Sequence, residues 1–302
     1  MTRMAVITIS FAPDFELCTA LNRSVLENSP DTVQHQIIVP RADLKLFNSL
    51  AGPRTQIRCE TDFLPRSIVR LPFSNLMINL RRPFPPVRGW IQQQIIKLAA
   101  IAASEEDVVL TVDSDIEFIQ PFTAEMFLRD SVVRFFCNPN QIDERLPRHM
   151  IWHRVAHVLL GLPHVEPPYP DFISSYLAWD PKLVRQMLAR VEVTTRRPWA
   201  TAIGAQLHFS ECVLYGVFVN EVAGALANSF VSGDPLCLSY WETTPLSLDS
   251  AADFIAKIRS SDIAVLIQSK SRTSLAYRKE ILASLRAAQN AAYGLEAPAG
   301  GF

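Results

Sequence analysis

The stretch VVLTVDSDIEF, residues 108–118, joins an apolar run to a series of acidic residues. The run is short and rich in valine, which is typical of a strand buried on both faces of a sheet. Asp113, Asp115 and Glu117 follow at intervals of two, so in an extended chain they would share one face. We therefore expect a core strand that carries carboxylates to the edge of a sheet.

Composition restricts the class of protein. The chain has 302 residues, of which 49% are hydrophobic, and this is enough for one large α/β domain or two smaller ones. A net charge of -1 argues against a general nucleic-acid binder, which usually carries a basic excess. The five cysteines are far apart and form no CxxC pair, which indicates reduced thiols rather than disulfides or a zinc site.

The N-terminal segment is not typical of a signal peptide, because its apolar stretch is short and runs into Pro13 and Asp14. No segment approaches the roughly 18 consecutive apolar residues of a membrane-spanning helix. We therefore expect a cytoplasmic protein, with peripheral contact at the inner face of the membrane left open. The arginines of segment 81–88 fit contact with a membrane surface, contact with an anionic acceptor, or an ordinary charged loop.

Strand-like and helix-like segments alternate in the first half of the chain. Strands are expected at 4–10, 35–40 and 107–113, and helices from Asp14 onward and at 87–104. This alternation predicts an α/β fold, with a mainly parallel mixed sheet flanked by helices.

The second half is less regular, and residues 293–302 have the composition of a disordered tail. Ser210 is a plausible N-cap for one of its helices. The segments expected there are strands at 131–136 and 172–179 and helices at 181–192, 208–224 and 274–291.

Polar groups follow several of the expected strands. Ser10 and Phe11 come after the first strand, Asp43 after the second, and Asp113 and Asp115 after the strand at 107–113. In parallel α/β sheets, ligands bind in the crevice beyond the carboxyl ends of the strands. We therefore expect these residues to contribute to a single binding crevice.

Two carboxylates separated by a small residue suit a hard divalent cation. Mg²⁺ or Mn²⁺ takes one or two protein carboxylates and completes its shell with water and phosphate oxygens. Bound by Asp113 and Asp115, such a cation would neutralise a diphosphate leaving group. The alternative is an ordinary solvated turn with acidic residues.

The sequence resembles a bacterial family of GT-A-type glycosyltransferases, long classed as proteins of unknown function. The resemblance runs from about residue 4 to 285 and is carried by the segments VITISF, GWIQQQIIKL, VLTVDSDIEFIQPF and SECVLYG. It implies a GT-A-like, Rossmann-like fold and a single catalytic domain over 1–292. Within that domain, about 1–120 would bind the nucleotide-sugar and about 121–292 would face the acceptor.

The resemblance also implies roles for individual residues. Asp115 would hold the metal, and Asp113 would hold the metal or the donor's ribose and sugar. Trp90, Gln93 and Lys97 match the family's helix before the DxD motif, which is Asp113-Ser114-Asp115 in this chain. Gln93 and Lys97 lie four residues apart, so a helix would present them together, and Lys97 could bind a phosphate. The alternative for this helix is an amphipathic one with Trp90 in the core.

In inverting GT-A enzymes an acidic residue near a helix start acts as general base, and Glu211 occupies such a place. The alternative is a residue that only favours a helix start. Trp152, Trp179 and Trp241 are candidates for stacking on a sugar ring, with a place in the core as the alternative for each, and Tyr215 is a candidate for lining the acceptor cleft.

Many GT-A enzymes add a late histidine to the metal site, but the last histidine here is His208. Either the DxD pair and water suffice, or the segments WETTP or IQSKSR contribute. Gln268, Ser269 and Lys270 follow an apolar strand and could close over the diphosphate, or form a solvated loop.

His149, His153 and His157 share a helical face and suggest a metal site, although no acidic or cysteine partner lies nearby in sequence.

The expected function is a metal-dependent glycosyltransferase that uses a UDP- or GDP-sugar donor and a glycan or lipid-linked acceptor, in bacterial surface polysaccharide synthesis. No nucleic-acid partner is expected. Two alternatives remain open: a non-catalytic glycan-binding scaffold of the same fold, and a nucleotidyltransferase. The latter usually carries a glycine-rich basic loop after its first strand, which SFAPDF lacks.

Overall fold

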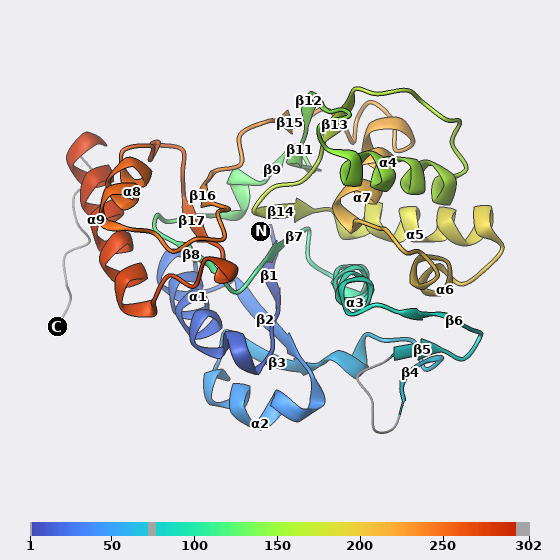
Figure 1. The fold of residues 1–302 in the computed structure, drawn as a ribbon, viewed down its shortest axis with the longest axis horizontal. Helices are drawn as coiled ribbons and strands as arrows, with labels where there is room; N and C mark the ends of the chain where they lie inside the picture. The colour runs from blue at the N-terminus through green and yellow to red at the C-terminus, as the bar shows by residue number, and fades with distance from the viewer. Residues whose placement is uncertain (1, 72–76, 294–302) are drawn as a thin grey trace.

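The computed structural model describes residues 2–71 and 77–293, and a five-stranded sheet lies at its centre (Figure 1). The strands, in spatial order, are β14 (Tyr176–Trp179), β7 (Val108–Val112), β1 (Met4–Ile9), β2 (Gln34–Val39) and β3 (Thr55–Cys59). Within this sheet β14 runs antiparallel to β7, and the other neighbours are parallel. The predicted fold class, a mainly parallel mixed sheet flanked by helices, is confirmed.

Helices cover both faces of this sheet. They are α1 (Phe15–Asn28), α2 (Leu44–Phe47), α3 (Gly89–Ala103), α4 (Pro147–Leu160), α5 (Pro181–Thr195), α6 (Trp199–Gly204) and α7 (Glu211–Glu221). The helices α8 (Leu248–Ile255) and α9 (Leu275–Tyr293) instead pack against a smaller sheet that includes residues 237–240 and 264–267. Short 3-10 helices lie at Ala12–Asp14, Arg41–Asp43, Asn48–Leu50, Glu60–Asp62, Ala124–Met126 and Ser269–Ser271.

Smaller sheets surround the central one. A three-stranded sheet is formed by β16 (Cys237–Tyr240), β17 (Ala264–Ile267) and β8 (Ile116–Phe118), and an antiparallel one by β4 (Ile68–Arg70), β5 (Met77–Asn79) and β6 (Arg82–Val87). Paired short strands are β9 (Leu128–Arg129) with β10 (Val132–Val133), β11 (Phe135–Phe136) with β15 (Val231–Ser232), and β12 (Asn138–Ile142) with β13 (Tyr169–Asp171).

The central strands β1 and β7 are buried on both faces. Ile7 and Val109 pack into a core with residues of α3 to α7, whereas Val6 and Leu110 pack into a second core that includes α1. This division follows from the alternation of side chains along a strand. Figure 1 shows α3 to α7 on one side of the central strands and α1, α8 and α9 on the other.

Several expected elements differ in extent. The segment 131–136 forms two separate short strands, β10 and β11, which pair with β9 and β15, and 172–179 is a strand only from Tyr176 onward. Residue 293, which was assigned to a disordered tail, is the last residue of α9, and 294–302 lie outside the described residues. The sequence reasoning also missed α6, β4 and β5, because these elements are short. It interpreted 81–88 as a possible charged loop, whereas residues 82–87 form β6, whose three prolines are not typical of a strand.

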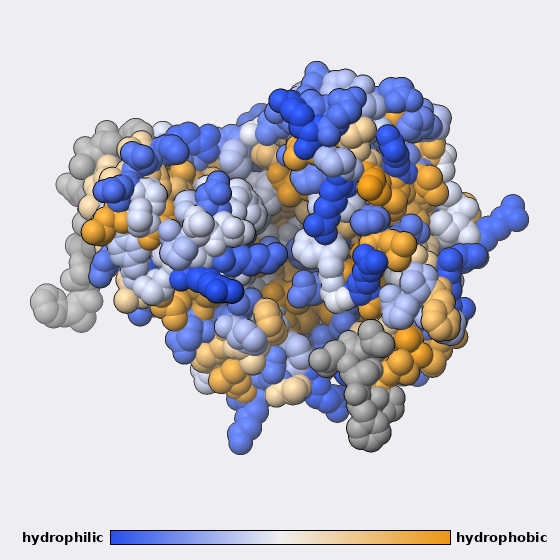
Figure 2. Space-filling model, in the orientation of Figure 1, coloured by the Kyte–Doolittle hydropathy of each residue, from blue (hydrophilic) through white to orange (hydrophobic). Residues whose placement is uncertain are grey.

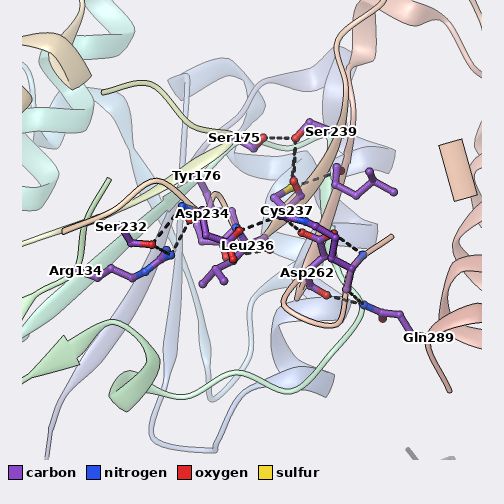
Figure 3. A network of polar contacts seen from close by, with 12 residues as sticks. Arg134, Ser175, Tyr176, Ser232, Asp234, Leu236, Cys237, Ser239, Asp262 and Gln289 are labelled. Atoms are coloured by element: carbon purple, nitrogen blue, oxygen red, sulfur yellow. Dashed lines mark hydrogen bonds and ion pairs between the residues drawn. The ribbon is translucent and has the colours of Figure 1, made fainter. Parts of the chain in front are cut away.

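A polar network joins the sheet of β16, β17 and β8 to the rest of the molecule (Figure 3). Arg134 donates to the Ser232 Oγ and to the Asp234 carbonyl, each at 2.7 Å. The Tyr176 hydroxyl, on β14, donates to the Leu236 carbonyl at 3.4 Å. These contacts fix β14 and the start of β16 beside each other.

A second polar group is fully enclosed between β1, β2, β3 and α1. His35 Nε2 lies 3.0 Å from the Thr8 hydroxyl, and His35 Nδ1 lies 2.8 Å from Asn22 Oδ1, which also accepts from Thr55. Asn22 Oδ1 can only accept, so Nδ1 carries the proton and Nε2 accepts from Thr8. Burial lowers the pKa of His35 to about 3, so the ring is neutral.

Hydrophilic residues cover much of the face in Figure 2, and hydrophobic ones are scattered over it in separate patches. Among the described residues, none of the helices combines the length and apolarity that crossing a membrane would require. All five cysteines fall within the described segments and are free.

Candidate functional site

A cavity of about 1040 Å³ opens beyond the carboxyl ends of β1 and β7. The ends of β16 and β17, the helices α3 and α7, and the segment around β14 complete its wall. Ten of the predicted site residues line it, namely Phe11, Trp90, Gln93, Lys97, Asp113, Asp115, Glu211, Gln268, Ser269 and Lys270. The expected crevice therefore exists and brings together residues that lie far apart in the sequence.

The acidic stretch after β7 is a turn rather than a continued strand. The amide of Ile116 donates to the carbonyl of Asp113 at 3.2 Å, and β8 then leads away from the cavity. The expectation that three acids share one extended face is therefore wrong. Asp113 and Asp115 face the cavity from the turn, whereas Glu117 belongs to β8 and pairs in register with Val265.

Asp115 is held by the loop after β17. Its Oδ2 accepts the backbone N–H of Ser269 at 2.7 Å. Burial and the neighbouring Asp113 carboxylate raise the pKa of Asp115 to about 6, although the Ser269 N–H opposes the shift. Arg278 of α9 stabilises this loop, because its guanidinium donates to the carbonyls of residues 267, 268 and 273.

Lys97 lies between two carboxylates. Its Nζ is 3.0 Å from Glu211 Oε1 and 3.7 Å from Asp113 Oδ1. Burial disfavours the ammonium, but these two carboxylates outweigh burial and raise the pKa of Lys97 above its usual range. The Glu211 side chain is only 4% exposed, so the pair is a buried ion pair at the cavity wall.

Gln94 positions Glu211, and the sequence reasoning did not single it out. Its Oε1 accepts the backbone N–H of Glu211 at 2.8 Å, and its Nε2 donates to the Phe209 carbonyl at 3.3 Å. The Trp90 indole donates to the same carbonyl at 3.1 Å. The Ser210 hydroxyl caps α7 as predicted, accepting from Val213 at 3.4 Å. Gln94 lies one helical turn after Trp90 on the same side of α3, but no local feature of the sequence marks its contact with Glu211.

Asp14 is a further carboxylate of the cavity. It was interpreted as a helix-start residue, and it does precede α1, but its side chain makes no capping hydrogen bond. Burial and the charge of Asp113 raise the pKa of Asp14. The carboxylate is therefore directed to the cavity rather than to the helix.

Two predicted ligand-binding residues lie outside the lining. The buried Ser10 hydroxyl accepts from Ser114 at 2.9 Å, and Asp43 accepts the Ala12 N–H at 2.9 Å. Both thus support the loops that carry Phe11 and the acidic turn. Their direct contact with a ligand stays a prediction.

The aromatic candidates divide into two groups. Trp152 and Trp241 line the cavity, and Trp241 is 56% exposed. Trp179 is fully buried and donates to the Thr111 hydroxyl at 2.7 Å, so it is a core residue. Tyr215 is also buried, with its hydroxyl accepting the Asp180 N–H.

The acidic turn fits a hard cation through its all-oxygen donor set. In the described ranges no three acidic, histidine or cysteine side chains are grouped to hold a metal, so water and ligand oxygens would complete the shell of a cation at Asp113 and Asp115. The row of histidines on α4 is no metal site either. His157 Nδ1 donates to the His153 carbonyl at 2.8 Å, and its Nε2 lies 3.3 Å from Glu221.

Comparison with solved structures finds glycosyltransferases. WbbM, a bifunctional glycosyltransferase, matches with a TM-score of 0.47 and 12% identity over 88% of this chain, which spans only 45% of that protein. Mouse xyloside xylosyltransferase 1 matches with a TM-score of 0.47 and 11% identity over 89% of this chain and 99% of its own. An active-site mutant of LgtC matches with a TM-score of 0.45 and 13% identity over 93% of this chain and 95% of its own.

No curated protein matches the sequence. A family model does match, and it covers residues 6–289, nearly the whole chain. The chain belongs to DUF6492, a family of unknown function.

Proposed function

We propose that this chain is a metal-dependent glycosyltransferase that moves a sugar from a UDP- or GDP-sugar to a glycan or lipid-linked acceptor. The observation that carries the proposal is the Asp113–Asp115 turn at the carboxyl end of β7, which faces a cavity also lined by Lys97 and Lys270. Paired carboxylates near lysine side chains suit a metal-bound diphosphate better than a neutral ligand. A single catalytic domain over 1–292 is part of the proposal.

Bound at Asp113 and Asp115, Mn²⁺ or Mg²⁺ would neutralise the diphosphate as it leaves. Lys97 adds a permanent positive charge beside Asp113. Gln268, Ser269 and Lys270 contribute side chains from a loop that is itself tied to Asp115. The loop and the acidic turn are therefore joined directly, and together they would hold the diphosphate.

Aromatic residues at the cavity suit the base and the sugar. Phe11 is 41% exposed and Trp90 is 50% exposed, and both line the cavity. Each presents a flat face on which a base or sugar ring can stack. The exposed Gln93, one turn before Lys97 on α3, can hydrogen-bond to donor hydroxyls.

Glu211 is our candidate for the general base. In the transfer step the acceptor oxygen would bond to the anomeric carbon, and the bond from that carbon to the diphosphate oxygen would break. The electron pair would leave with the diphosphate, and the acceptor proton would pass to Glu211. Lys97 and Gln94 hold the carboxylate and the backbone of Glu211 in place for this role.

The remaining parts of the proposal rest on the resemblance of the sequence to a bacterial glycosyltransferase family and, for membrane contact, on its arginines. These parts are a place in bacterial surface polysaccharide synthesis, a cytoplasmic location and peripheral membrane contact through the arginines of 81–88.

The proposal is tested with a panel of UDP- and GDP-sugars, with and without Mn²⁺. We expect one donor to raise the melting temperature only with metal, and to release nucleoside diphosphate. Asp115→Asn should abolish the metal-dependent shift and slow release about 100-fold or more. Glu117→Gln is the matched control, because it removes an acid of the same stretch that does not line the cavity.

Full metal-dependent turnover by Asp115→Asn would contradict the proposal. A glycan-binding scaffold would give no donor-dependent shift at all. A nucleotidyltransferase would release inorganic diphosphate from a nucleoside triphosphate and a sugar phosphate instead.

A further inference from the structure

One part of the cavity is not used by the donor-binding groups. It is formed by Asn138 of β12, Asp171 of β13, His149 of α4 and the neighbouring Ser174. Asn138 and Asp171 are cross-strand partners, and Asp171 acts electrostatically on His149, so these side chains form one cluster. Figure 1 shows β12, β13 and α4 on the far side of β7 from α1 and β17.

Two polar atoms of this cluster have no hydrogen-bond partner in the protein. They are His149 Nδ1 and Ser174 Oγ, and both are buried. A buried polar atom without a partner is destabilising, so such atoms in a cavity wall indicate a site where a ligand supplies the missing partner. Both groups hydrogen-bond to hydroxyls, which are the commonest polar groups of a sugar.

The cluster contains one acid and no cation. Asp171 accepts the Ile173 N–H through Oδ1 at 3.0 Å and is also hydrogen-bonded by the Phe172 N–H, while burial raises the pKa of its carboxyl. Burial lowers the pKa of His149, so its ring is neutral near pH 7 and does not compensate the carboxylate. The guanidinium of Arg148 stacks over the Trp152 ring and does not line the cavity. A carboxylate with neutral polar neighbours accepts from hydroxyls and repels a second carboxylate.

The cavity reaches from the acidic turn to this cluster, because residues of both line it. Its volume of about 1040 Å³ lies at the upper end of the roughly 300–1,000 Å³ typical of small-molecule pockets. The cluster is therefore the part of the cavity wall that the donor-binding groups leave for a second ligand.

We propose that Asn138, His149, Asp171 and Ser174 form the acceptor subsite, that it takes an uncharged hexose residue, and that Asp171 sets the specificity against acidic sugars. This inference rests on the proposed function, because it assigns the second substrate of the same cavity.

The test uses methyl glycosides of glucose, galactose, mannose, N-acetylglucosamine and glucuronic acid as probes, with the full chain. Binding is measured by saturation-transfer NMR, and donor binding is measured separately by thermal shift with Mn²⁺. We expect at least one neutral glycoside to bind and the glucuronide not to bind. Asp171→Asn should weaken the neutral glycoside at least tenfold and admit the glucuronide, without changing the donor shift. Asn keeps an oxygen for the Ile173 N–H, so the loop is retained.

Ser174→Ala is a second variant in case Asp171→Asn does not fold, and it should weaken the same glycoside several-fold. Glu166→Gln is the control, because its side chain is 80% exposed and lies outside the cavity. Three results would overturn the inference. The unaltered chain could bind the glucuronide as well as the neutral glycosides, or it could bind none of the probes. The folded variants could also bind the glycosides as the unaltered chain does. Absence of any donor shift in the unaltered chain would instead contradict the proposed function, and the two failures are therefore distinguishable.

Discussion

Replacing Lys97 with methionine should lower the free energy of unfolding by about 3–5 kcal/mol, the usual cost of removing one partner of a buried ion pair. Methionine keeps the apolar stem of the side chain, so the change isolates the charge. Lys97 and Glu211 are 18% and 4% exposed, and their charged atoms lie 3.0 Å apart. Without the ammonium, Glu211 must stay charged in a poorly solvated place or take up a proton, and either outcome is destabilising.

The size of the effect should depend on Glu211 rather than on Asp113. The Asp113 side chain is 62% exposed and 3.7 Å from the ammonium, so water can solvate it after the change. The double variant Lys97→Met with Glu211→Gln should therefore recover most of the loss, because it leaves no buried charge. The coupling free energy between the two positions should reach about 2–3 kcal/mol.

Urea unfolding at pH 7, analysed for midpoint and slope, measures these quantities. The matched control is Arg23→Met, since Arg23 and Glu27 form an exposed pair at 3.9 Å. It should cost less than about 0.5 kcal/mol. The reasoning is refuted if Lys97→Met costs under about 1 kcal/mol, or if the double variant shows the sum of the two single losses.

Three further predictions concern the scaffold of the site. His35 has its pKa lowered to about 3 in the folded state, so the unfolded chain binds the proton first. Stability should therefore fall as pH drops below about 6.5, by up to about 1.4 kcal/mol per unit, and His35→Gln should remove that part of the slope in urea titrations. Gly216→Ala should lower the free energy of unfolding by about 1–3 kcal/mol in thermal unfolding, because a Cβ there would lie 2.1 Å from a ring atom of Phe172. Gly89→Ala is the control and should lower it by less than about 0.5 kcal/mol, because a Cβ there would meet open space. Ser210→Ala removes the cap of α7 and should cost about 0.5–1 kcal/mol in the same assay.

The parts of the fold that sequence could predict are those with a strong local signal. The valine-rich run of β7 and the β-branched run of β1 indicated strands covered on both faces, and both strands divide their side chains between two cores. The N-cap at Ser210 was likewise visible from residue type and spacing alone. These signals depend only on neighbouring residues, so they can be recognised in a single sequence.

Relations between distant segments could not be predicted in the same way. Gln94 contacts Glu211 across 117 positions, and nothing near either residue marks that contact. The antiparallel addition of β14 beside β7 is also set by long-range pairing. Asp14 was missed for another reason: an acid before a helix is usually a cap, and only the structure reveals that its carboxylate lies in the cavity wall.

The charge of the cavity bears on how a donor could bind. Among the described residues that line it, carboxyl groups outnumber ammonium groups by five to two. A diphosphate would add further negative charge to a space that already raises the pKa of Asp14 and Asp115. Lys97 cannot resolve this alone, because its ammonium is already shared between Glu211 and Asp113. A divalent cation at the acidic turn would reverse the sign of the field at that point, so the same acids that repel a free diphosphate would favour a metal-bound one. The excess of acid is therefore an argument for metal dependence that is independent of the spacing of Asp113 and Asp115.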